Sequence, residues 1–510
     1  MKPALILPST AGGIAVNIRQ TAKAALEQYA QTGLFFRKGL SVVRMVSDQK
    51  LGAKFVPVTS AYMQTQLFEM FNIAEWRGRG NSAQLRDSIE IKDITLKGIL
   101  GSDLVETLIL PVQVISRVQY LVLEGAELVL LKQGYNPQRG GIYVTGSEPP
   151  EEVPTEKAAA AISAIFSDYD FATPSDRSRC IAGVLCTAMR LAGVFERMPF
   201  LVYEADLSQT GKTKMWATTI AMNGQRCGTV TQKKGGVGSL DEQIMEKLVD
   251  GCPAVLFDNM KGRLDSPFFE ACMASEGGSL SARIAGVRGM EVDPGLTQFG
   301  LTSNGVELTT DAANRAMMIR IRKRRSGYAF RQWTNAKGKP VDLRQHVEAH
   351  TRFYTGCVHS IVLDWWKNGA QQEACSEHDF AESVGALDYM VQRYFGLPSL
   401  MDGHRATLDR STKPGMSWLR GVALKAAKDW IVTDWKATKL AESCARDGVA
   451  IPGAEGKDAD TAAQKIGSLM AEAFGSQDMI NVDGVEVIRK QESDSKGRWN
   501  KTYTFKRVQA

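Results

Sequence analysis

Short apolar runs alternate with helical segments between residues 199 and 322. The expected strands cover residues 199–205, 228–232, 252–258, 297–304 and 315–322. One helix is expected over residues 211–222, and another begins at Ser239, whose Ser-x-x-Glu spacing to Glu242 is that of a capping box. Strands that alternate with helices are typical of a parallel sheet covered by helices, so this region predicts an α/β core.

The flanking regions have other patterns. Apolar and polar positions alternate within residues 114–135, which predicts a hairpin, and the Pro- and Glu-rich segment 146–156 is expected to be a linker. Near the end of the chain, a helix over residues 462–475 precedes two strands within residues 484–507, around a polar turn that contains glycine. We therefore expect an α+β N-terminal domain for a collar or partner contact (1–150), the α/β core (151–330), a helical domain (331–440) and a winged helix (441–510).

Composition narrows the class of protein. A chain of 510 residues exceeds one compact core, and its 44% hydrophobic and 23% charged residues are ordinary for a globular protein. The formal net charge of +6 suits a nucleic-acid partner and suits a slightly basic enzyme equally well. No apolar run reaches the roughly 18–20 residues needed to cross a membrane, since the longest candidate, Ile181–Phe195, contains Arg190. A cytoplasmic protein without membrane contact is expected.

The cysteines and histidines do not form a metal-binding pattern. The eight cysteines include no CxxC pair, and most lie in apolar surroundings, as reduced buried thiols do. His346 and His350 are four residues apart on an expected helix, with Cys357 and His359 beyond them, but no HExxH motif is present. Ordinary histidines on a helix surface are the better interpretation.

The turn after the first core strand has the strongest chemical signal. Residues 206–213 read DLSQTGKT, which is the phosphate-binding pattern GxxxxGK[ST] with Asp206 in place of the first glycine. A strand before and a helix after the turn are the context that this motif requires, because backbone N–H groups at the helix start hold the anion. Lys212 is expected to reach the β- and γ-phosphates, and the Thr213 hydroxyl to bind Mg²⁺. The expected ATP contacts are Ser208, Gln209, Thr210, Gly211, Lys212, Thr213 and Lys214.

The strand over residues 252–258 ends in an acid. Asp258 should therefore lie at the carboxyl edge of the sheet, where it can bind Mg²⁺ directly or through water. Asn259 follows at the position where many such ATPases have a catalytic Glu, so the general base stays open. Glu242 is one candidate for the base, and its role as a capping residue is an equally good interpretation.

Two further polar residues are expected to act on the γ-phosphate. Asn304 ends the strand over residues 297–304 and can orient the attacking water. Arg315 is placed to act as an arginine finger across a subunit interface, which would stabilise charge on the transferring phosphoryl group. A surface salt bridge to Asp311, four residues earlier, is the alternative role.

These segments resemble the AAA+ and superfamily-3-like helicases of phage and mobile-element replication proteins, the helicase half of phage and plasmid primases. The resembling segments are residues 207–214, 238–259, 282–286 and 301–321. The resemblance implies an ATP- and Mg²⁺-dependent DNA helicase that forms a homo-oligomeric ring, a hexamer. Asp206 departs from the pattern, and so does Asn314 where an Arg-Arg pair is common. No primase domain is visible, so priming would need a separate partner.

Two basic segments are the expected DNA contacts. In such ATPases a hairpin between the acidic strand and the Asn strand projects into the ring channel; here it would be residues 279–293, with Arg283 and Arg288 to grip single-stranded DNA. A plain connecting hairpin is the alternative. The turn of the winged helix would contact duplex phosphates, unless this domain contacts protein instead. Its candidate side chains are Lys496, Arg498, Trp499 and Lys501.

The same core can serve two other functions. An origin-binding initiator would assemble on duplex DNA through the winged helix and use ATP hydrolysis only to reset. A remodelling or defence ATPase would use the core without separating strands. DNA-stimulated ATPase activity and strand displacement distinguish the helicase from both.

Overall fold

The protein was analysed as a computed structural model of the whole chain. The structure describes all residues except 1, 10–15, 50–51, 79–81, 206–208, 232–237, 265, 276, 285–286, 326–327, 336, 406, 409–415, 430–433, 450, 452–453, 455–457, 476, 483, 494–498 and 508–510. The chain divides into two compact units. The first comprises residues 1–260, 266–304 and 315–402, and the second comprises residues 261–265, 305–314 and 403–510.

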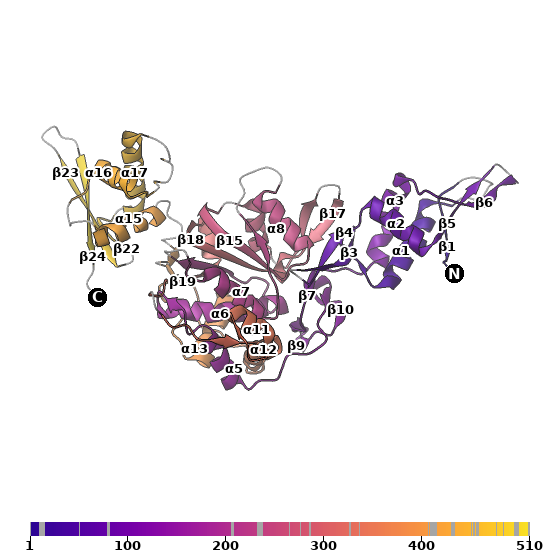
Figure 1. Cartoon of the computed structure of the whole chain (residues 1–510), viewed down its shortest axis with the longest axis horizontal. Coiled ribbons are helices and arrows are strands. Elements are labelled where there is room, and N and C mark those ends of the chain that lie inside the picture. The colour runs from indigo at the N-terminus through magenta and orange to yellow at the C-terminus, as the bar shows by residue number, and fades with distance from the viewer. Residues whose placement is uncertain are drawn as a thin grey trace. The chain divides into compact units, whose positions relative to one another are not determined.

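A six-stranded sheet forms the centre of the core, as Figure 1 shows, and the order of its strands is β12-β19-β13-β18-β15-β14. The strands are β12 (Asp170–Phe171), β13 (Phe200–Ala205), β14 (Gly228–Val230), β15 (Ala254–Arg263), β18 (Gln298–Glu307) and β19 (Ala316–Arg322). β13 runs parallel to β18 and β19, β14 runs parallel to β15, and the short β12 pairs antiparallel with β19. The prediction of a mixed α/β core with a mostly parallel sheet is confirmed.

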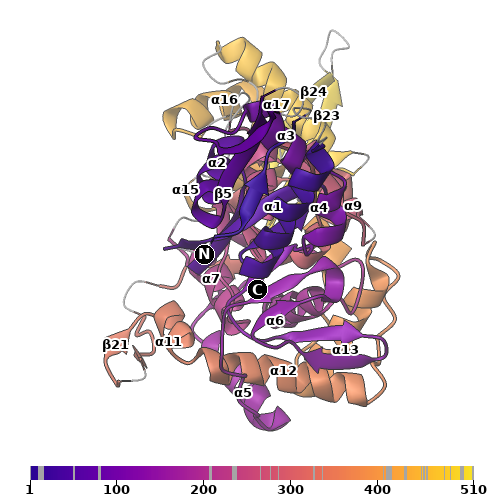
Figure 2. The same ribbon diagram turned by 90° about the vertical axis from the view of Figure 1, so that its right-hand side faces the viewer.

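Helices from distant parts of the chain pack around this sheet. They are α5 (Thr155–Ile165), α6 (Pro174–Ala192), α7 (Lys212–Met222), α8 (Leu240–Val249), α9 (Pro267–Ala274), α11 (Leu343–Ala349), α12 (Thr351–Lys367) and α13 (Ala381–Phe395). α12 packs on α5, and α13 packs on α6 (Figure 2). Helices α11 to α13, which were expected in a separate domain over residues 331–440, therefore share a compact unit with the sheet. Trp365 of α12, almost fully buried, contributes to this shared packing.

The N-terminal part of the first unit combines helices and strands, as expected. Its elements are β1 (Ala4–Ile6), α1 (Ile18–Thr32), β2 (Phe35–Lys38), β3 (Ser41–Asp48), β4 (Gly52–Pro57), α2 (Ser60–Met70), β5 (Asn72–Arg77), β6 (Gln84–Asp87), α3 (Asp93–Leu100), α4 (Leu104–Leu108), β7 (Val114–Ser116), β8 (Leu121–Glu124), β9 (Glu127–Leu130), β10 (Gly134–Asn136) and β11 (Ile142–Val144). The apolar faces of α1, α2 and α3 bury a common cluster that includes Leu26, Leu67 and Ile99. β8 and β9 form the hairpin expected within residues 114–135.

Lys38, at the end of β2, is a fully buried lysine that joins this part to the core. Its Nζ donates hydrogen bonds to the carbonyl oxygens of Gln113 at 2.6 Å and of Leu248 in α8 at 2.8 Å. Burial lowers the pKa of Lys38 from 10.5 to about 7, against the opposing effect of Cys252, Asp250 and Asp293. The ammonium form is therefore disfavoured in the folded state.

This burial predicts a pH-dependent stability. Between pH 7 and about 10.5 the unfolded chain binds one proton more at Lys38 than the folded chain does, so the free energy of unfolding should rise with pH in this window. Below pH 7 the lysine is protonated in both states, and the contribution no longer changes. Lys38→Met should lose this part of the pH dependence, which thermal unfolding midpoints of both proteins at pH 6 and pH 9 would measure. An equal rise for the two proteins would contradict the assignment.

The second unit builds its own core near the C-terminus. Its elements include α15 (Met416–Asp429), α16 (Ala437–Arg446), α17 (Ala459–Phe474), β22 (Met479–Val482), β23 (Val485–Ser493) and β24 (Trp499–Arg507). The two strands expected within residues 484–507 are β23 and β24, which pair antiparallel. Leu419 and Val422 of α15 lie in the same buried cluster as Leu440 and Ile466. The expected boundary at residues 440 and 441 thus falls inside this unit, because α15 contributes to its core.

Within the described residues, no helix combines the length and the apolar character that a membrane span needs. All eight cysteines are free thiols, and Cys180, Cys186, Cys252, Cys272, Cys357 and Cys444 are buried, as expected for reduced core thiols.

Candidate functional site

The loop after β13 leads directly into α7 through a glycine in the left-handed region. Gly211 has φ +95° and is the N-cap of α7. A Cβ at this position would lie 3.2 Å from Cε1 of Tyr169, so a side chain here would be both strained and crowded. Burial raises the pKa of the Tyr169 phenol, which keeps the ring neutral against the loop. Among the other expected ATP contacts, Gln209 and Lys214 are exposed, and Ser208 lies outside the described residues. Asp206, which replaces the first glycine of the pattern, also lies outside them.

Lys212 and Asn304, 92 residues apart in the sequence, meet at the carboxyl ends of neighbouring strands. The Lys212 Nζ donates to Asn304 Oδ1 at 2.5 Å and to Thr210 Oγ1 at 3.4 Å. Lys212 is buried, whereas Asn304 is exposed. Lys212 follows β13, Asn304 lies in β18, and these two strands pair parallel. The sheet therefore brings the phosphate-loop lysine and the expected water-orienting amide within hydrogen-bonding distance.

Thr213 and Asp258, the two expected Mg²⁺ ligands, are also in contact. Thr213 Oγ1 donates to Asp258 Oδ1 at 3.0 Å, and Thr302 Oγ1 donates to the same oxygen at 2.7 Å. Hydroxyl and carboxylate oxygens are the ligands that Mg²⁺ prefers, and this ion commonly uses only one or two protein oxygens. The pair therefore fits a Mg²⁺ site in its chemistry and in its spacing. Among the described residues, no group of three or more His, Cys, Asp or Glu side chains forms a metal cluster.

Asn259 has an unusual backbone conformation next to Asp258. Its φ is +52°, in the left-handed region that asparagine tolerates better than most residues, and its N–H donates to Thr302 Oγ1 at 2.9 Å. Thr302 thus links the backbone of Asn259 to the carboxylate of Asp258. The Asn259 side chain is exposed, and an amide has no basic group that could take a proton at neutral pH.

Glu242 is engaged at the start of α8. The Ser239 hydroxyl accepts from the Glu242 N–H at 3.4 Å, and the Glu242 carboxylate accepts from the Gly238 N–H. Ser239 is therefore the N-cap of α8, as the spacing predicted. The carboxylate reaches Gly238 instead of the Ser239 N–H of a strict capping box. In the described structure, Glu242 therefore acts as a capping residue of α8.

Arg315 lies at the amino ends of the parallel strands, whereas Lys212 lies at their carboxyl ends. Parallel pairing runs from Phe200↔Ala316 to Ala205↔Ile321, so Arg315 precedes the amino end of β19 while Lys212 follows the carboxyl end of β13. At about 3.3 Å per residue, the strand alone separates the two ends by roughly 20 Å. Arg315 Nε lies 3.9 Å from Asp379 Oδ2 in the same unit, a pairing that sequence spacing did not indicate.

The expected hairpin between the acidic strand and the Asn strand is present. β16 (Leu280–Ile284) and β17 (Val287–Val292) pair antiparallel. Its Gly289 carbonyl accepts from the Leu40 N–H at 2.9 Å, so the turn between β2 and β3 holds one side of the hairpin. Arg283 and Arg288 lie on its two strands, but their side chains are outside the described part of the structure.

In the second unit, Lys501 is an exposed residue of β24. Trp499 begins the same strand, opposite Ser493 of β23. The Trp499 side chain and residues Lys496 and Arg498 lie outside the described structure. The role of these four residues stays a prediction.

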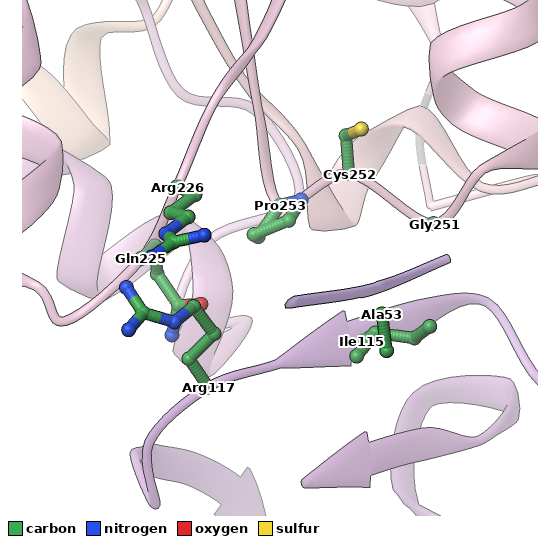
Figure 3. Close-up of a pocket in the computed structure, with 8 residues that line it drawn as sticks. All are labelled: Ala53, Ile115, Arg117, Gln225, Arg226, Gly251, Cys252 and Pro253. Atoms are coloured by element: carbon green, nitrogen blue, oxygen red, sulfur yellow. The ribbon is translucent and has the colours of Figure 1, made fainter. Parts of the chain in front are cut away.

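A separate pocket, whose lining side chains are drawn in Figure 3, lies at the amino ends of β14 and β15. It is lined by Ala53, Ile115, Arg117, Gln225, Arg226, Gly251, Cys252 and Pro253. Burial and the nearby Arg226 lower the pKa of Arg117. Ligands of open parallel sheets bind outside the carboxyl ends of the strands. This pocket is therefore at the wrong edge of the sheet to share a ligand with Lys212 and Asp258.

Comparisons with known proteins find structural similarity but no related family. No protein family matches the chain, and no curated protein matches it. A solved structure described as the A form apo structure of the NrS-1 C-terminal region is similar over 94% of this chain and 98% of that chain, with 10% sequence identity and a TM-score of 0.32. A TM-score this low does not establish a common fold.

Proposed function

We propose that this chain is an ATP-dependent DNA helicase that acts in the replication of a phage or a mobile genetic element. The observation that carries the proposal is the meeting of Lys212 with Asn304 and of Thr213 with Asp258 at the carboxyl edge of the sheet. These are the four polar residues that a P-loop ATPase needs, and they come from three separate segments. Chance packing would not be expected to bring together this set of side chains.

The residues divide the work of ATP hydrolysis among them. Backbone N–H groups at the start of α7 and the Lys212 ammonium bind the phosphates, and Gly211 permits their close approach. Thr213 and Asp258 would hold Mg²⁺, which supplies positive charge to the β- and γ-phosphate oxygens. Asn304 would orient the attacking water. In the described structure the Asn304 side chain accepts a hydrogen bond from the Lys212 ammonium. A bound phosphate would compete for this ammonium, and Asn304 could then orient the attacking water.

The DNA-binding parts of the proposal rest on two hairpins. The β16–β17 hairpin would contact a single strand in the channel of a homo-oligomeric ring, which we propose to be a hexamer. The second unit, with α16 and α17 followed by β22, β23 and β24, would act as a winged helix on duplex DNA. The sequences of both elements contain basic residues, which would gain affinity for phosphates by releasing counterions.

The proposal is tested by the ATPase rate with and without single-stranded DNA, together with displacement of a labelled strand. A helicase is stimulated by the single strand and displaces its partner. An origin-binding initiator would prefer one duplex sequence and displace little. A remodelling ATPase would respond to neither DNA, and that result would refute the helicase assignment.

Substitutions in the hairpin should uncouple ATP hydrolysis from DNA. Arg283→Ala with Arg288→Ala should leave the basal ATPase rate near that of the unmodified protein, because neither residue belongs to the nucleotide site. DNA stimulation and strand displacement should fall, since the lost guanidinium groups can no longer bind phosphates. Ser281→Ala, on the same hairpin, is the matched control that removes no charge. If the double variant unwinds DNA as well as the control does, the hairpin is only a connector.

A further inference from the structure

The segment that follows β19 is strongly basic. Residues 322–341 contain seven Lys or Arg residues and no Asp or Glu. Lys323, Arg325 and Arg331 are exposed. A run of like charges alone is usually a solvated surface, so the charge does not by itself define a binding site.

The same segment also exposes aromatic rings. Phe330 has 59% of its surface exposed and Tyr328 has 37%, and their ring centroids lie 4.9 Å apart in an edge-to-face arrangement. Trp333, three residues beyond Phe330, is partly exposed. Neighbouring apolar rings that are exposed together and rimmed by polar residues often mark an interaction site. The side chains Lys323, Arg325, Tyr328, Phe330, Arg331 and Trp333 are called here the basic aromatic strip.

Specific contacts hold Tyr328, Arg331 and Trp333 of the strip in place. The Asp168 carboxylate accepts from the Tyr328 hydroxyl at 3.1 Å and from the Arg331 N–H at 2.9 Å. Arg324 donates to the carbonyl oxygens of Asp168 and Tyr169, both at 2.9 Å, and its guanidinium lies over the Tyr328 ring at 4.4 Å. The Arg331 guanidinium lies 5.2 Å from the centre of the Trp333 ring. A surface ordered in this way loses little conformational entropy when it binds a partner.

We propose that the basic aromatic strip binds single-stranded nucleic acid. Unpaired bases would stack on Phe330 and Tyr328, and Lys323 and Arg325 would bind the phosphates beside them. Basic side chains beside exposed rings are the combination that single strands require, because a duplex keeps its bases stacked inside. The proposal deepens the helicase function, on which it rests for its biological role, but the binding itself requires no ATP.

Stacking and charge can be separated by two variants of the full chain. Fluorescence anisotropy without nucleotide would measure the affinity for a labelled oligothymidine and for an abasic strand of the same length. Phe330→Ala should weaken binding of the oligothymidine about tenfold, as expected for the loss of one stacked base, and should leave the abasic strand unaffected. Because Phe330 is mostly exposed, its loss should not disturb folding.

The charge variant combines Lys323→Gln with Arg325→Gln. It should weaken binding of both strands and reduce the slope of log affinity against log salt by about 1.4, which is two phosphate contacts at about 0.7 each. Lys92→Gln with Lys97→Gln removes the same charge from exposed positions elsewhere and should change the slope much less. An oligouridine of equal length tells whether the bound strand is DNA or RNA.

Unchanged oligothymidine affinity in Phe330→Ala, or equal effects of the charge variant and its control, would overturn the proposal. Either result would assign the exposed rings to a protein partner or to no partner. The ATPase rate of the same preparations distinguishes a failure of the helicase proposal from a failure of the strip proposal. A chain that binds the strand through Phe330 but does not hydrolyse ATP would refute the helicase and leave the strip intact.

Discussion

Lys212→Ala is expected to abolish ATP hydrolysis while the protein stays folded. At the proposed nucleotide site the Lys212 ammonium would act on phosphate charge, and its loss removes the side-chain hydrogen bonds to Asn304 and Thr210. Hydrogen bonds of a charged group contribute roughly 1.5–3 kcal/mol each, so the thermal midpoint should fall but the protein should remain folded. Turnover should fall by orders of magnitude, because that charge is needed where negative charge develops on the phosphates.

Steady-state phosphate release measures this effect, with the circular dichroism spectrum as the test of folding. Lys97→Ala, at an exposed lysine of α3 that pairs with Asp93, is the control for the loss of one lysine. Turnover in purified Lys212→Ala close to that of the control would remove the basis for a P-loop enzyme.

The second large effect is expected at Arg315. Its place beyond the amino end of β19, roughly 20 Å from the carboxyl ends of the strands in the same sheet, would keep it from a nucleotide at the proposed site of its own chain. If Arg315 is an arginine finger, Arg315→Ala should still bind ATP but lose about 10³–10⁵ in turnover, the range for such residues in other NTPases. Mixing it with Lys212→Ala should restore part of the activity, because some interfaces then join an intact phosphate loop to an intact Arg315.

Asp379→Asn separates the finger from a structural ion pair. If Arg315 serves only to pair with Asp379, the two variants should behave alike and lose at most about 1 kcal/mol of stability. A finger predicts that Asp379→Asn keeps its turnover while Arg315→Ala does not. The mixing experiment over a range of ratios completes the test. An inactive Arg315→Ala that no mixture rescues would assign the residue a role within its own subunit.

The sequence predicted the core elements well, because their signals are local. The apolar run over residues 199–205 became β13 over Phe200–Ala205, and Ser239 caps α8 as its spacing indicated. The hairpin β23–β24 also lies where two strands around a polar, glycine-containing turn were expected. Each of these predictions depends on neighbours within about ten residues, which a single sequence contains.

Several contacts between distant segments were not predicted. Thr302 was missed as the residue that donates to Asp258, although a threonine two residues before Asn304 on the same strand face was a usable signal. The sequence contains no signal for the contact of Tyr169 with Gly211 or for that of Asp379 with Arg315. Each pair joins segments that only the folded chain brings together. The assignment of α13 and α15 to different units was not predicted either, because it depends on which distant segments each helix packs against.

The placement of Arg315 and Lys212 at opposite edges of one sheet constrains how copies of the chain could assemble. If Arg315 completes the site of a neighbouring subunit, the two subunits meet head to tail. A two-fold symmetric dimer does not provide an interface of this kind. Head-to-tail contacts either close into a ring or continue as an open filament. An open chain of subunits always leaves one phosphate loop without a finger. Specific activity should therefore rise with protein concentration and level off once closure removes that last incomplete site.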